Sequence, residues 1–167
     1  MKVLGIDPSL TSTGFAILDN GKLVHYGSVA TNTKSEMMDR HIIIYNTIWN
    51  VVEVYKPDVI GIESQYLCGI NSNAILKVVE VAGIIEGLYY AYCQINSKDK
   101  RILSVAPSGA KSAVGVGKMK RAESKKAVKK MVSLMFKEVN KKGIAQDVYD
   151  AISIAVYTND SAKLGLV

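Results

Sequence analysis

The chain has 167 residues, of which 49% are apolar, and a formal net charge of +6. This length is typical of one folded domain with its own core, and the composition excludes a disordered tail. No apolar run reaches the ~18 to 20 residues of a membrane span, and the first residues lack the pattern of a signal peptide. We therefore expect a cytoplasmic protein with a single domain over residues 1–167.

Three strands are predicted at the start of the chain, over residues 2–7, 13–19 and 22–29. The first is a short apolar run that ends on a carboxylate, Asp7. The second and third are joined by an Asn-Gly pair, which is favoured in two-residue hairpin turns. An apolar strand that ends on an acid raises the question of what that acid does at the edge of a sheet.

The middle of the chain alternates helices and strands. Apolar residues recur at helical spacing over 35–56, and a strand over 58–64 again carries an acid near its end, Glu63. A helix over 73–93 is apolar nearly all round, so it must be covered on several sides. A further strand is predicted over 101–107. A hairpin followed by this alternation predicts an α/β fold with a five-stranded mixed sheet flanked by helices.

The last third of the chain is strongly basic. A Gly-rich stretch over 112–121 precedes a basic helix over 122–139, and a final helix covers 146–160. From Lys111 to Lys130 there are eight basic residues and one acid, so this stretch carries +7 and the remaining residues −1. A local patch of this kind is typical of a polyanion-binding site, and a solvated lysine-rich helix face is the alternative interpretation.

Four carboxylates occupy related places in this pattern. Asp7 and Glu63 end apolar strands, while Asp147 and Asp150 lie one turn apart on one face of the final helix. Each alone has a structural explanation, and acids also stabilise a helix N-terminus. If the two strands run parallel side by side, Asp7 and Glu63 emerge at one sheet edge. A final helix that brings Asp147 and Asp150 to that edge would complete a cluster of four acids. Such a cluster of carboxylates suits Mg²⁺ or Mn²⁺. Two such ions held ~4 Å apart are a recurring arrangement for in-line attack on a phosphodiester.

The motifs "GIDPS…TG" around Asp7, "IGIES" around Glu63 and "DVYDAISIA" with Asp147 and Asp150 resemble those of the RuvC family of Holliday junction resolvases. The resemblance spans nearly the whole chain in order and spacing. It implies an RNase H-like fold in which these four acids are metal-binding and catalytic. It also implies a homodimer, with the helix over 73–93 in its interface. This dimer would cut four-way DNA junctions by paired nicks with Mg²⁺, leaving 5′-phosphate and 3′-hydroxyl ends.

The resemblance gives further residues a role in binding DNA. Tyr66 falls where family members carry an aromatic side chain that stacks on an unpaired base, and such stacking is worth roughly 1–3 kcal/mol. Lys111 and Lys125 align with basic residues near the scissile phosphate, and Lys125 is expected to offset charge in the transition state. The other cations expected to contact DNA are Lys118, Lys120 and Arg121.

The stretch "KMKRAES" is longer and more basic than in familiar bacterial members. Its extra charge predicts affinity for DNA without reading of its sequence, and action on other branched DNA besides four-way junctions. A compact, lysine-rich chain is also compatible with a bacteriophage or mobile-element origin.

Two alternatives remain open from the sequence. One is an RNase H-like nuclease that acts on RNA or serves in its processing, and another is a junction-binding protein without cleavage. A third, an actin-like or sugar-kinase protein, is disfavoured because that class needs a second phosphate loop and a second domain, for which 167 residues leave no room. A P-loop is excluded because Ser112 and Met119 replace residues that its motif requires, so no nucleotide cofactor is expected.

Overall fold

The computed structural model describes residues 1–64 and 72–167. Its strands are β1 (Lys2–Asp7), β2 (Ser12–Asp19), β3 (Lys22–Ala30), β4 (Val59–Glu63) and β5 (Ile102–Val105). They form one five-stranded sheet in the order β3-β2-β1-β4-β5. β1 pairs antiparallel with β2 and parallel with β4, which confirms the predicted mixed sheet.

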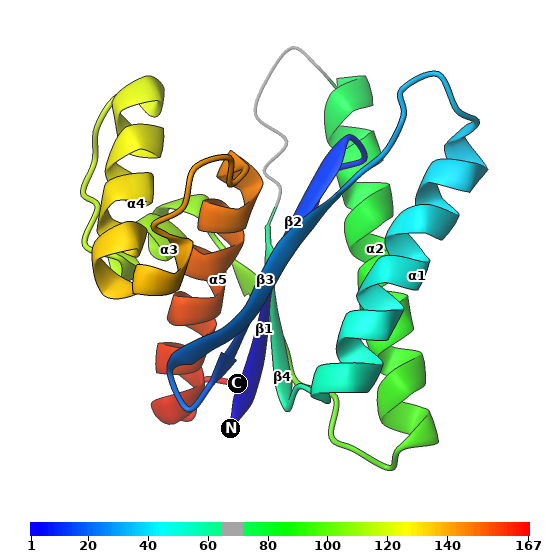
Figure 1. Ribbon diagram of the computed structural model, residues 1–167. Coiled ribbons are helices and arrows are strands. Elements are labelled where there is room, and N and C mark those ends of the chain that lie inside the picture. The colour runs from blue at the N-terminus through cyan, green and yellow to red at the C-terminus, as the bar shows by residue number, and fades with distance from the viewer. Residues whose placement is uncertain (65–71) are drawn as a thin grey trace.

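Helices cover both faces of this sheet (Figure 1). They are α1 (Met37–Tyr55), α2 (Ser72–Ile95), α3 (Pro107–Ala113), α4 (Arg121–Met135) and α5 (Gln146–Lys163), with a 3₁₀ helix η1 (Lys137–Val139). α1 and α2 pack on one face, and α3, α4 and α5 lie on the other. The first face buries a cluster that includes Ile48 and Ile85, and the second a cluster with Val132 and Ile152. None of the described helices is long and apolar enough to cross a membrane.

Two local features follow the sequence closely. Asn20 and Gly21 both have positive φ, 50° and 80°, as a two-residue hairpin turn of type I′ requires. α1 ends where Lys56 adopts a left-handed conformation, immediately before Pro57. The residue before a proline is disfavoured in the helical region, so the helix stops at the predicted place.

The segment after β5 differs from the prediction. The strand expected over 101–107 ends at Val105, and Pro107 then opens the short helix α3. Proline is well accepted in the first turn of a helix, because no backbone N–H is needed there. The helix expected over 122–139 ends at Met135, since the next residue is extended and its phenyl ring is buried in the core.

Glycines in the sheet let α5 lie unusually close to the strands. A Cβ atom on Gly5 of β1 would come within 2.4 Å of the carbonyl oxygen of Ala151. A Cβ on Gly14 of β2 would come within 2.1 Å of the carbonyl oxygen of Asp147. Any larger residue at these two positions would push α5 off the sheet, so the glycines fix where the N-terminal turn of α5 stands relative to β1.

Candidate active site at the edge of the sheet

Asp7 and Glu63 leave the sheet at the same edge. β1 and β4 are parallel neighbours, and their register pairs Ile6 with Ile62. The next residue on each strand is therefore the acid, and both acids stand at the carboxyl ends of their strands. This confirms the parallel arrangement on which the predicted cluster depends.

The acids of α5 reach this edge through close backbone packing. Asp7 pairs in register with Gly14, and Gly14 lies against the backbone of Asp147. Asp150 follows one helical turn later on the same face of α5. The four acids together line one pocket of about 360 Å³. The structure thus brings together carboxylates from three elements of the chain.

The four charges act on one another inside this pocket. Burial and, after it, the negative charges of Glu63, Asp150 and Asp147, in that order, raise the pKa of Asp7 to about 8. Lys125 opposes this shift. Burial is the largest cause and all three other acids act on Asp7 as well, so a positive ligand at this carboxylate would offset both effects.

The carboxyl group of Asp150 is also buried near other acids, but more neighbouring groups act to lower its pKa. Burial raises the pKa of its carboxyl group, and the charge of Asp147 adds to the increase. Three groups oppose it: the side-chain amide of Gln146, which donates a hydrogen bond of 3.1 Å to Oδ1, and the charges of Lys125 and Lys111. Sequence reasoning missed Gln146, although its place four residues before Asp150 on the same helix face could have revealed it.

Two lysines of the basic stretch line the acid pocket. Lys111 comes from α3 and Lys125 from α4, so both predicted phosphate-binding lysines stand beside the carboxylates. Lys111 also lines a neighbouring hollow together with Lys118. The two hollows therefore adjoin at Lys111, which lies between the acids and Lys118.

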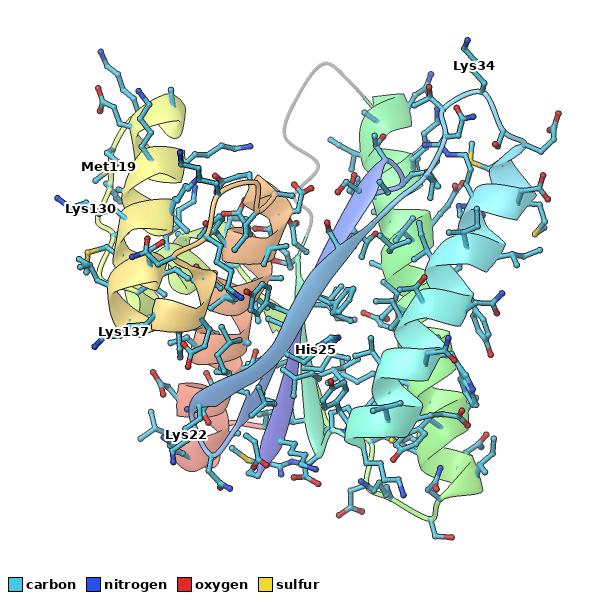
Figure 2. All side chains as sticks on the ribbon, in the orientation of Figure 1. Lys22, His25, Lys34, Met119, Lys130 and Lys137 are labelled. Atoms are coloured by element: carbon cyan, nitrogen blue, oxygen red, sulfur yellow. The ribbon has the colours of Figure 1, made fainter. Side chains whose placement is uncertain are left out.

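The rest of the basic stretch is spread around α4. Lys120 is exposed at the residue before α4, and Arg121 is the first residue of that helix. Lys130 projects from the outer side of α4, away from the sheet (Figure 2). Some lysines of the basic stretch therefore line the acid pocket, and others form a solvated face. Tyr66, the predicted stacking residue, lies outside the described residues.

The carboxylates surround the pocket without forming a finished coordination shell. Among residues 1–64 and 72–167, no three acidic, His or Cys side chains are grouped closely enough to hold one metal ion. The four candidate donors are carboxylates, which suit Mg²⁺ and Mn²⁺, whereas zinc favours nitrogen and sulfur. These residues therefore fit a hard divalent cation.

A mixed five-stranded sheet of this order, with acids at the ends of its two central parallel strands, defines an RNase H-like fold. The family model described as crossover junction endodeoxyribonuclease RuvC matches residues 3–158, and the chain belongs to this family. Its relatives include the RuvC of Finegoldia magna, 32% identical over 93% of this chain and 91% of that protein. The RuvC of Halothermothrix orenii is 29% identical over 98% of this chain and 95% of that protein.

Solved structures agree with this fold. The Thermus thermophilus RuvC in complex with a Holliday junction substrate matches with a TM-score of 0.74 and 20% identity, over 99% of this chain and 96% of that one. The yeast mitochondrial Holliday junction resolvase Ydc2 matches with a TM-score of 0.62 and 19% identity, over 98% and 80% of the two chains. At these identities the likeness establishes the fold.

Proposed function

We propose that this chain is a metal-dependent, structure-specific DNA endonuclease that resolves Holliday junctions by paired nicks, leaving 5′-phosphate and 3′-hydroxyl ends. The observation that carries this proposal is the pocket in which acids from β1, β4 and α5 face Lys111 and Lys125. Family membership supports the substrate. We place the enzyme in the cytoplasm as one nuclease domain over residues 1–167.

The cofactor in this proposal is Mg²⁺, two ions per site, with Mn²⁺ able to substitute. The residues that would hold it are Asp7, Glu63, Asp147 and Asp150, which line one pocket. Divalent ions, when bound, supply Lewis-acid activation of water and stabilise the departing 3′-oxygen. Asp7 has the central position, because it interacts with all three other acids.

Cations of the chain hold the DNA and its developing charge. Lys125 acts on both Asp7 and Asp150, so it is placed to offset negative charge on the scissile phosphate in the transition state. Lys111 lines the same pocket and would hold that phosphate or its neighbour. The residues proposed to bind the flanking DNA are Tyr66, Lys118, Lys120 and Arg121.

The test is cleavage of a labelled four-way junction with Mg²⁺, with EDTA, and with a linear duplex and an RNA hairpin as controls. We expect paired nicks in the junction with Mg²⁺, no cleavage in EDTA and little cleavage of the duplex. Faster cleavage of the RNA hairpin would favour the alternative of an RNA-directed nuclease. Junction binding with no cleavage in either Mg²⁺ or Mn²⁺ would favour the alternative of a junction-binding protein without nuclease activity.

We also propose that the enzyme is a homodimer that uses α2. The outer face of this helix exposes large apolar side chains, with Leu76 52%, Val79 47% and Tyr90 43% exposed. Gly83 and Gly87 lie between them with open space above. Exposed apolar side chains with two glycines between them suit contact with a second copy, and a two-fold dimer presents two sites to the two-fold symmetry of a junction.

The dimer predicts a solution mass of about twice 18.2 kDa. The double variant Leu76→Glu, Val79→Glu is expected to shift the mass to one chain and to abolish paired nicking, because two like charges would face their copies across the axis. Leu134→Glu on α4 is the matched control, since Leu134 is 67% exposed on the other face of the sheet. A monomeric parent protein that still makes paired nicks would contradict the proposal. Light scattering gives the mass.

A further inference from the structure

A buried arginine stands apart from the acid pocket, on the opposite face of the sheet. Arg40 in α1 is only 7% exposed. Its Nε donates a hydrogen bond of 2.9 Å to the hydroxyl of Thr31, and its Nη2 donates one of 3.1 Å to the carbonyl oxygen of Leu10. Both acceptors are neutral, so these bonds orient the guanidinium without balancing its charge.

No described carboxylate balances this charge either. The described ion pairs join His41 to Glu80 and Lys98 to Asp58, and neither involves Arg40. A buried charge is costly unless an opposite charge or several hydrogen bonds accompany it. A guanidinium has five N–H donors, and two of its nitrogens have protein partners here. The side chain is thus prepared for an anionic partner.

The hollow in front of Arg40 has the lining that such a partner needs. Lys77 of α2 adds a second cation, and Ser9, Thr11 and Thr33 add hydroxyl groups, with no carboxylate among the lining residues. The hydroxyl oxygen of Ser9 accepts the backbone N–H of Thr11 at 3.3 Å, which leaves its proton free to donate. Two cations with several hydroxyl donors match the tetrahedral oxygens of a phosphate.

The position of this hollow relates it to the acid pocket. Ser9 and Thr11 follow β1, whose last residue is Asp7, so both hollows open at the same edge of the sheet. They lie on opposite faces, since α1 and α2 cover one face while α4 and α5 cover the other (Figure 1). Each has a volume of about 360 Å³. A DNA strand that crosses this edge would therefore meet Lys111 and Lys125 beside the acids on one face of the sheet, and Arg40 and Lys77 on the other.

We propose that the hollow between Arg40 and Lys77 binds a backbone phosphate of the DNA, separate from the phosphate that is cut. The identity of the polymer rests on the proposed function, while the phosphate chemistry rests on the hollow itself. By anchoring the strand on the α1–α2 face, this second contact positions the strand over the acids. Arg40 and Lys77 are binding residues in this proposal and take no part in the chemistry.

The test uses the Asp7→Asn variant, so that DNA is bound without being cut, and follows junction binding by fluorescence anisotropy over a series of salt concentrations. Adding Lys77→Gln is expected to reduce the slope of log K against log[salt] by about 0.9, the value for one lost phosphate contact. Lys22→Gln is the matched control, because Lys22 is exposed at the opposite end of the molecule (Figure 2). It is expected to leave the slope unchanged.

Neutral methylphosphonates placed singly along the junction strands locate the contact. At one position other than the scissile phosphate, a methylphosphonate should weaken junction binding by the Asp7→Asn protein. The same methylphosphonate should have no further effect when Lys77→Gln is also present. The Arg40→Lys variant, once its melting temperature is shown to be unchanged, should lose affinity through its contact with the same phosphate. Equal slopes for Lys77→Gln and Lys22→Gln, or no such position, would overturn the proposal. The salt dependence is also measured on linear duplex, so the phosphate contact is tested whichever DNA is bound. The proposed function is tested separately, by whether the Asp7→Asn protein binds the junction more tightly than duplex or RNA.

Discussion

Asp7→Asn is expected to lower the rate of junction cleavage by about 10³-fold or more while leaving junction binding nearly unchanged. Asp7 is the acid on which the three other carboxylates act, and Asn keeps its shape while removing its charge. Binding depends on cations instead, two of which line the pocket beside the acids. Single-turnover cleavage of a labelled junction gives the rate, and anisotropy gives the affinity.

Asp19→Asn is the matched control, since Asp19 ends β2 at its pairing with Lys2, at the opposite end of β1 from Asp7. This variant should cut at the rate of the unaltered protein. An Asp7→Asn protein that cuts as fast as Asp19→Asn would show that Asp7 has been assigned the wrong role. Loss of binding together with cleavage would show that the acid, and not the lysines, holds the DNA.

The acid cluster could be predicted because each of its members follows from a local pattern. Asp7 and Glu63 are recognisable as the polar ends of apolar strands, and the spacing of Asp147 and Asp150 is a property of any helix. The step from four acids to one pocket needed the parallel pairing of β1 and β4 and also the close packing of α5 against Gly14. A hairpin followed by alternating strands and helices made that pairing the expected one.

The short helix α3 could not be predicted in the same way. Its seven residues offer too little periodicity to distinguish a helix from a Gly-containing loop. The sequence therefore placed Lys111 beside the acids only through family resemblance. Pro107 was the available signal, because proline is common in the first turn of a helix, and it was assigned to the end of a strand instead.

The burial of Arg40 could not be predicted from the sequence for a different reason. In sequence it is one charged residue in the first turns of a helix, where an exposed position is the ordinary expectation. Its burial depends on acceptors 9 and 30 residues away, at Thr31 and Leu10. Contacts of this kind arise from how the loop after β1 meets α1, and no local pattern encodes them.

Without divalent metal, the free energy of unfolding is expected to fall as the pH rises from about 4 to about 8. The folded protein holds the proton of Asp7 up to a pKa of about 8, whereas the unfolded chain releases it near 3.8. Between these values the folded state binds more protons, so raising the pH favours unfolding. One such proton contributes a slope of at most about 1.4 kcal/mol per pH unit.

Urea denaturation in EDTA at several pH values measures this slope, and Asp7→Asn serves as the reference. The variant lacks the titrating carboxyl but keeps every other group, including His25, whose pKa burial lowers. The variant should therefore exceed the unaltered protein in stability by an amount that grows with pH and levels off above about 8. Parallel curves for the two proteins would mean that Asp7 is already ionised in the folded state, and that the cluster is less repulsive than its burial and neighbours imply.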